Sequence, residues 1–192
     1  GQPVDNDMAG PLGLDRPGGI IVSGLHPSSP FLAAGLEVGD VITAVDGAPV
    51  NTPAEMIYRM SVAGLGRAAD VTRLREGKAE VIRVELIAAP DTPARDPVTL
   101  GQRSLLPGLQ LMRINPAVLS EMPLPLQSEG VVVTDPGVAA RVGLRARDVI
   151  LAINGVEISH PDDAVTVLGG QVRRIEMIVQ RGAGRTVLRF RV

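Results

Sequence analysis

A phrase of thirteen residues occurs twice in this chain and limits it to a fold built from two copies of one module. Residues 35–47 are GLEVGDVITAVDG and residues 143–155 are GLRARDVILAING, so seven of the thirteen positions are identical. Each copy predicts a turn, a short buried strand and a tight hairpin turn in succession. Glycine suits such turns because a β-carbon penalises positive φ. We therefore predict two domains of the same fold.

Length and composition agree with two small domains that have aliphatic cores. The chain has 192 residues, enough for two domains of about 90 residues each. Apolar residues make up 45% of it, but only three residues are aromatic. Three rings are too few for stacking along single-stranded nucleic acid, and a net charge of −2 gives no basic surface for a duplex. We expect no nucleic-acid partner.

The sequence also excludes several other classes of site. It contains no cysteine, which excludes disulfides and thiolate metal sites, and we expect neither a metal nor a cofactor. No apolar stretch approaches the roughly 18 residues of a membrane span. The first residue is Gly1, without an initiating Met or a signal-peptide pattern, so we expect a fragment of a longer protein.

Helix signals occur at corresponding places in the two copies. Thr52-Pro53 predicts a helix start, with Thr52 as N-cap, and the helix is expected to end near Ala63. His160-Pro161 predicts the matching helix of the second copy, which the pair Gly169-Gly170 ends. With five or six short strands, each module is then a small α+β domain, a partly closed antiparallel barrel or sandwich capped by one long and one short helix.

A proline-rich stretch lies between the two copies. Three prolines fall within residues 89–97, and no apolar periodicity accompanies them. Proline favours extended backbone, so the stretch is typical of a semi-rigid linker. The predicted organisation is a first domain over residues 1–90, a linker over 91–103 and a second domain over 104–192.

The order of these elements resembles a bacterial PDZ domain. The phrases "GGIIV" and "GLEVGDVITAVDG" carry the resemblance in the first copy, and "LPGLQL", "EGVVV" and "GLRARDVILAING" carry it in the second. The tandem arrangement is similar to the C-terminal region of periplasmic serine proteases of the HtrA/Deg family. That resemblance implies a periplasmic location, a protease domain elsewhere in the parent chain and a role in protein quality control. The resemblance is also compatible with a homo-oligomer of the full-length protein.

The resemblance also implies where a peptide would bind. PDZ domains add a peptide as a strand beside the long helix, and backbone N–H groups of a glycine-containing loop hold its terminal carboxylate. In the second domain the implied peptide-binding residues are Leu106, Pro107, Gly108, Leu109, Leu111, Val165 and Leu168, with residues 109–114 as the receiving strand. In the first domain the corresponding helix positions are Ile57 and Met60, which are expected to face outward while Met56 faces inward.

Two departures from the family pattern affect these sites. Pro107 has no N–H, so the carboxylate loop of the second domain has one donor fewer. The equivalent loop of the first domain would precede Gln2, and the expectation is that its first strand and loop are missing from this sequence.

The chain offers no catalytic constellation of its own. Its two histidines are predicted to be a loop residue, His26, and a helix-start residue, His160. No G-x-S-x-G elbow or G-D-S-G stretch supplies a nucleophile, so this chain is not expected to be an enzyme, whereas its parent is expected to be a serine endopeptidase. Acidic pairs such as Asp162-Asp163 are typical of the first turn of a helix.

Three functions fit these features. The first is a regulatory region of an HtrA/Deg-like protease that binds apolar C-termini or unfolded segments and aids assembly. The second is a stand-alone scaffold or adaptor. The third is the PDZ portion of a membrane-embedded metalloprotease. The sequence upstream of Gly1 would separate them, because each implies a different neighbouring domain.

Overall fold

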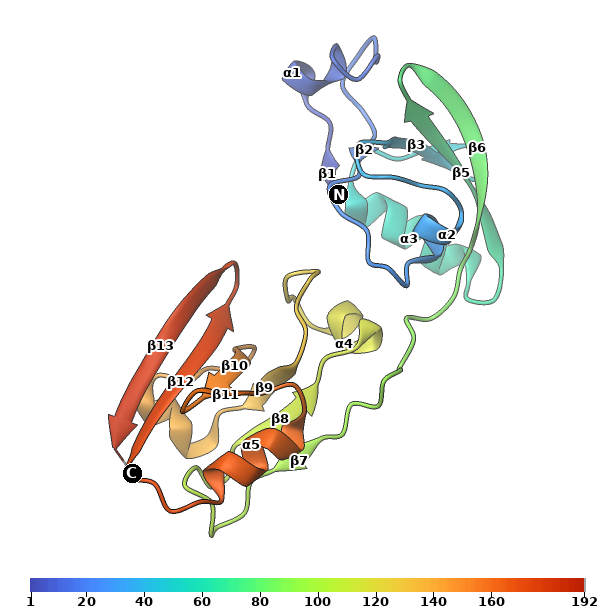
Figure 1. Cartoon of the computed structure of the whole chain (residues 1–192). Helices are drawn as coiled ribbons and strands as arrows, with labels where there is room; N and C mark the ends of the chain where they lie inside the picture. Colours follow the sequence, from blue (N-terminus) through green and yellow to red (C-terminus); the bar gives the residue numbers. More distant parts are fainter. Residues whose placement is uncertain (192) are drawn as a thin grey trace. The chain divides into compact units, whose positions relative to one another are not determined.

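The computed structural model describes residues 1–191, which form two compact units that meet between Ala88 and Ala89. We call Gly1–Ala88 unit 1, and unit 2 begins at Ala89. Each unit contains one copy of the repeated phrase, its own sheet and its own hydrophobic core (Figure 1).

Unit 1 is an antiparallel sheet with two short helices and one long helix. Its elements are β1 (Gln2–Pro3), α1 (Asn6–Ala9), β2 (Ile20–Ile21), α2 (Pro30–Ala33), β3 (Val41–Val45), β4 (Ala48–Pro49), α3 (Pro53–Ala63), β5 (Ala68–Arg75) and β6 (Lys78–Glu85). The strand order is β1-β2-β3-β5-β6, with β4 paired to β3. The core is aliphatic, as the composition predicts, and centres on Ile20, Leu36 and Val71.

Unit 2 repeats this plan with one additional strand. Its elements are β7 (Val98–Thr99), β8 (Gln110–Arg113), α4 (Pro116–Glu121), β9 (Val131–Asp135), a 3₁₀ helix η1 (Gly137–Val142), β10 (Val149–Ile153), β11 (Val156–Glu157), α5 (Pro161–Leu168), β12 (Arg174–Arg181) and β13 (Gly184–Arg191). The order is β13-β12-β10-β9-β8-β7, with β11 paired to β10. Every strand pair in both sheets is antiparallel, so the predicted α+β class is confirmed.

The repeated phrase forms the same structure in both units, including one irregularity. The register between β3 and β5 shifts between Ile42 and Ala44, and the register between β10 and β12 shifts between Ile150 and Ala152. One turn glycine of the phrase is not shared, because Arg147 of unit 2 stands where unit 1 has Gly39. Arg147 nevertheless adopts a left-handed φ of 71°. Its N–H donates to Val133 O at 2.7 Å, and this bond fixes the turn although the residue is not glycine.

The predicted helix starts are confirmed. Thr52 is the N-cap of α3, and its Oγ1 accepts the N–H of Glu55 at 3.2 Å. His160 is the N-cap of α5, whose Asp163 side chain accepts the N–H of His160 at 2.8 Å and so completes a capping box. These side chains satisfy backbone donors that a helix leaves unpaired at its N-terminus.

We expect Thr52→Ala to destabilise unit 1 by about 1 kcal/mol, because it leaves an N-terminal donor of α3 without its cap. Urea unfolding can be followed by the fluorescence of Tyr58, since the chain has no other Tyr and no Trp. Ser61→Ala in the same helix is the control. The Ser61 hydroxyl donates only to Ile57 O, and its loss should change the free energy of unfolding little. Equal effects of the two substitutions would contradict the capping role.

Residues 91–103, for which the sequence predicts a linker, are packed against unit 2. Val98–Thr99 is strand β7 of its sheet, and Leu100 is buried in its core. The N–H of Ala117 donates to Pro90 O at 3.1 Å. The prediction followed proline content alone, but prolines also suit an edge strand, where no N–H is needed on the outer side.

Candidate functional site

The strand and helix expected to hold a peptide are neighbours in unit 2. Strand β8 contacts α5, and the loop before β8 is bonded to the end of that helix, where Leu105 N–H donates to Leu168 O at 3.0 Å. We call this site the second groove; its residues are Leu106, Leu109, Leu111, Val165 and Leu168. Four of the five are at most 3% exposed and lie in one core cluster, whereas Val165 is 41% exposed. Leu168 is thus a fully buried residue.

The loop that would hold a carboxylate uses its N–H groups within the chain. Leu106 N–H donates to Ser104 Oγ at 3.2 Å, and Leu109 N–H donates to Leu106 O at 3.3 Å. Gly108 N–H donates to Leu100 O at 2.8 Å. Pro107 has no N–H to offer. An incoming carboxylate must therefore displace one of these internal acceptors.

An internal strand occupies the outer edge of β8. Val98 pairs with Leu111 and Thr99 with Gln110, and Leu100 N–H donates to Leu109 O at 2.8 Å. Further along, Arg113 N–H donates to Arg95 O at 2.6 Å. We call residues 94–100 the inner segment. The sequence contained one signal for it, the apolar alternation Val98-Thr99-Leu100 after a proline, which is typical of a short strand.

Four side chains hold the start of the inner segment to α4, and we call them the clamp: Asp91, Arg95, Asn115 and Glu121. Arg95 makes a bidentate ion pair with Glu121 at 2.6 and 2.7 Å, and its Nε donates to Asp91 Oδ1 at 2.7 Å. Asn115 Nδ2 donates to the same Asp91 oxygen at 2.7 Å. Hydrogen bonds from Arg95 lower the pKa of Glu121, and those from Arg95 and Asn115 lower the pKa of Asp91.

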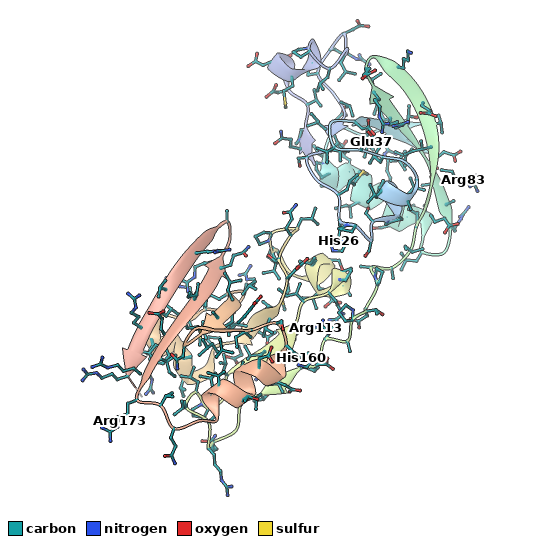
Figure 2. All side chains as sticks on the ribbon, viewed as in Figure 1. His26, Glu37, Arg83, Arg113, His160 and Arg173 are labelled. Atoms are coloured by element: carbon teal, nitrogen blue, oxygen red, sulfur yellow. The ribbon has the colours of Figure 1, made fainter. Side chains whose placement is uncertain are left out.

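His160 joins the inner segment to α5. Its Nδ1 accepts the N–H of Asp162 at 3.2 Å, and its Nε2 lies 3.0 Å from Asp96 Oδ2. Since Nδ1 is an acceptor, a neutral ring carries its proton on Nε2 and donates it to Asp96. Figure 2 shows His160 at the start of α5 in unit 2. With both ring nitrogens engaged, His160 is a positioning residue here and not a free general base.

Unit 1 has the same strand position at its sheet edge, without an internal strand on it. Strand β1 pairs with β2 as β8 pairs with β9, with Pro3 opposite Ile20 as Arg113 is opposite Val131. Among the described residues β1 pairs with no second strand. Pro3 supplies no N–H to that edge, so a peptide added there would lack one backbone bond.

Helix α3 of unit 1 has one of its two predicted groove residues exposed. Ile57 on α3 is 60% exposed, as expected for a residue that faces a ligand. Met60 is partly buried and packs against the core together with Met56. The prediction placed Met60 outward and Met56 inward, but the helical stripe turns both methionines toward the sheet.

The aspartate of each repeated phrase is buried and paired with arginine. Asp40 is 1% exposed and makes a bidentate pair with Arg75 at 2.6 and 2.8 Å, plus a bond from Arg73 at 3.2 Å. Burial alone raises the pKa of Asp40, but the hydrogen bonds from Arg75, the Glu37 N–H and Arg73 outweigh it and lower that pKa to about 2. Asp148 of unit 2 is likewise 1% exposed and pairs bidentately with Arg181 at 2.6 and 2.7 Å.

Comparison with protein families identifies both units. Residues 2–86 and residues 131–181 each match a family model described as a PDZ domain. The chain is a tandem of two PDZ domains. The first match begins at β1, and the second match covers β9 to β12. The resemblance seen in the repeated phrase is thereby confirmed.

Curated relatives of the tandem carry the description "Probable periplasmic serine endoprotease DegP-like". The relative from Brucella suis biovar 1 (strain 1330) is 33% identical over 84% of this chain and 31% of its own length. Those from Rhizobium meliloti (strain 1021) and Halomonas elongata are 29% and 28% identical over 87% and 88% of this chain. The PDZ tandem thus spans about a third of the length of these relatives.

Other kinds of site are not indicated by the described part of the chain. Within residues 1–191, no group of three histidine and carboxylate side chains is arranged to hold a metal ion. Over the same residues, no helix combines the length and hydropathy that crossing a membrane requires.

Proposed function

We propose that this PDZ tandem is the peptide-binding regulatory region of a periplasmic, trypsin-type serine protease of the HtrA/Deg family. Its ligands would be apolar C-termini or extended segments of unfolded proteins, taken up as an added strand. Binding would deliver these segments to a protease domain elsewhere in the parent chain and aid assembly of the full-length protein. The relatives named as DegP-like periplasmic endoproteases support this proposal.

One observation carries the proposal: the edge of β8 holds an extended, antiparallel segment whose Leu100 is buried among apolar residues of the groove. Strand addition provides affinity through backbone hydrogen bonds, whatever the sequence of the added strand. Selectivity would then come from the apolar cluster that contains Leu100, in which Leu106, Leu109 and Leu168 would provide an aliphatic wall for the last side chain of a ligand. A small or branched apolar residue fits such a wall, whereas a charged residue would be desolvated without a partner.

The chain's own chemistry is binding and not bond cleavage in this proposal. His160 is held by the Asp162 N–H and by Asp96. His26 closes a local turn, where its Nδ1 accepts the N–H of Ser28 at 3.1 Å. Neither ring lies in a triad of nucleophile, base and acid, which hydrolysis by a serine protease requires.

The test is titration of the full chain with peptides that end in Val, Leu, Phe or Ala. The same peptides with an amidated C-terminus are titrated for comparison, and binding is followed by the NMR shifts of the backbone amides. We expect shifts along β1 and α3 in unit 1, where Ile57→Glu should weaken binding at least tenfold, because a charge would face the apolar ligand. Val81→Glu is the matched control, since Val81 on β6 is 61% exposed and lies outside the groove.

The pattern of outcomes decides the proposal. Binding at β1 that does not depend on the terminal carboxylate, and that Ile57→Glu weakens but Val81→Glu does not, supports strand addition. No shift in either unit with any peptide would overturn the peptide-binding function and favour a tandem that acts only in assembly or scaffolding.

A further inference from the structure

We propose that the inner segment, residues 94–100, is an intramolecular ligand of the second groove and competes with external peptides for it. The inference rests on the proposed function, because it names what controls access to one of the two peptide sites. Unit 2 would thus be self-occupied at rest, and only a ligand that displaces the inner segment would bind there.

The placement of the inner segment matches that of a strand-forming ligand. It runs antiparallel to β8 and ends at the loop that precedes β8, where Leu100 O accepts the N–H of Gly108 at 2.8 Å. A peptide ending at this position would place a carboxylate oxygen at the same N–H. The backbone carbonyl of Leu100 therefore takes the acceptor position of a terminal carboxylate, with half the oxygens and no charge.

The side chains of the inner segment also occupy ligand positions. Leu100 is 4% exposed and belongs to the cluster that contains Leu106 and Leu168, and Val98 packs against the same cluster. Asp96 lies against His160 at the N-terminus of α5. The near-complete burial of the four groove leucines thus has a cause, since Leu100 of the inner segment already packs in their cluster.

The contacts that hold the inner segment are weak enough to be exchanged. Strand β7 pairs with β8 over only two residue pairs. The carboxylates of the clamp are exposed, with Glu121 at 54% and Asp91 at 59% of their side-chain surface, and ion pairs in contact with water contribute little.

Competition of this kind follows a simple relation. When only a fraction of molecules has an open groove, the apparent Kd of a peptide equals the intrinsic Kd divided by that fraction. A substitution that weakens the clamp raises the open fraction and tightens peptide binding without touching the groove. A covalent lock between β7 and β8 lowers the fraction and weakens binding. These opposite shifts distinguish competition from a structural role of the inner segment.

The probe is the synthetic peptide Ala-Arg-Asp-Pro-Val-Thr-Leu, the sequence of residues 94–100 with a free terminal carboxylate. It is titrated into five forms of the full chain (unmodified, opened, locked and oxidised, locked and reduced, and a control), and binding is located by the amide shifts of β8 and α5. The opened form is Arg95→Ala, which removes the bidentate pair with Glu121. The locked form is Thr99→Cys/Gln110→Cys, at two exposed residues that face each other across β7 and β8.

The chain offers matched controls for both changes. It has no other cysteine, so reduction of the locked form opens only the introduced bond. Arg83→Ala is the control for the opened form, because Arg83 is an exposed arginine of unit 1 whose 3.7 Å pair with Asp70 involves no residue of unit 2. Amide exchange of Leu100 and Arg113, which bond the inner segment to β8, reports opening independently of any peptide.

We expect Arg95→Ala to bind the probe about threefold more tightly than the unmodified chain, as the loss of an ion pair in contact with water predicts. The oxidised locked form should bind at least tenfold more weakly than its reduced form, and Arg83→Ala should be unchanged. Equal affinity in all forms, with unchanged exchange at Leu100 and Arg113, overturns the proposal. If Leu100 exchanges faster in Arg95→Ala but no peptide binds, the clamp holds the inner segment on β8. The second groove is then not a peptide site, and the proposed competition is wrong.

Discussion

Asp40→Asn is expected to destabilise unit 1 by about 3 kcal/mol, because it removes the anion between two arginines in a buried site. Asp40 is 1% exposed and accepts hydrogen bonds from Arg75, from Arg73 and from the Glu37 N–H. An asparagine keeps the shape and one acceptor, but it brings N–H donors against guanidinium groups. The side chain of Arg73 is only 12% exposed and would lose its Asp40 partner.

The same pair gives a pH dependence with a definite sign. The pKa of Asp40 is lowered from 3.8 to about 2, so the folded state favours the charged carboxylate. Its stabilisation is complete above the unfolded pKa and is lost as pH falls toward the folded pKa, that is, between about pH 4 and pH 2. The shift corresponds to about 2 kcal/mol at 1.36 kcal/mol for each pH unit.

Urea unfolding at pH 7 and at pH 3, followed by Tyr58 fluorescence, measures both effects. The unmodified chain should lose stability between the two pH values, and Asp40→Asn should lose less, because its side chain cannot be protonated there. Lys78→Met is a control for a charge change on the β5–β6 hairpin, which carries Arg73 and Arg75, since Lys78 is exposed. A cost of Asp40→Asn below about 1 kcal/mol would contradict the importance of the buried pair.

The sequence predicts the tandem fold because its strongest signals are local. Thr52-Pro53 and His160-Pro161 fix helix starts through donors only two or three residues away, and the structure places α3 and α5 as predicted. The repeated phrase determines a strand and its turns by the same short-range chemistry. Capping and turn signals of this kind depend on residues close in sequence, so they can be read without knowing which strands pair.

The state of the second groove could not be predicted, since it depends on residues far apart in sequence. Arg95 and Glu121 are 26 residues apart, and Asp96 and His160 are 64 residues apart. Proline content within residues 89–97 predicts extended backbone, which is correct for a linker and for an edge strand alike. A linker and an edge strand differ in whether the extended backbone pairs with a neighbouring strand. That pairing is determined by tertiary packing.

The buried aspartates also have partners that the sequence does not predict. Asp40 and Asp148 occupy the same position of the repeated phrase, but their arginine partners lie on strands about 35 residues later. The unit 1 pair has a second arginine, Arg73, where unit 2 has the buried apolar residue Val179 at the same register. The aspartate that the two phrases share thus has different neighbours in the two units, and the sequence of the phrase does not specify them.

Gly137→Ala is expected to destabilise unit 2 by about 3 kcal/mol and to displace the loop that ends the second groove. Gly137 begins η1 with a φ of 52°, which costs a residue with a β-carbon about 1–2 kcal/mol. A β-carbon there would also lie 2.6 Å from the carbonyl carbon and oxygen of Gly108. Both are backbone atoms that cannot rotate away, so either η1 or the loop must move, at a further cost of about 1–3 kcal/mol.

Gly182→Ala separates the two contributions. Gly182 has a similar φ of 57°, but a β-carbon on this residue would meet no other atom within 4 Å, so this substitution measures the cost of the backbone conformation alone. Urea unfolding of both variants is followed at the amide of Met177, which is fully buried in unit 2. A cost for Gly137→Ala equal to that of Gly182→Ala would contradict the close approach of η1 to the loop.

Gly137→Ala also tests how the loop holds the inner segment. Gly108 carries the N–H that donates to Leu100 O, so a shift of Gly108 should break that bond. Leu100 amide exchange should then accelerate more in Gly137→Ala than in Gly182→Ala, even at urea concentrations that equalise their global stability. The comparison matters because global unfolding exposes Leu100 in both variants equally, whereas movement of the loop releases it only in the first. A selective acceleration would link the glycine on η1 to access to the second groove.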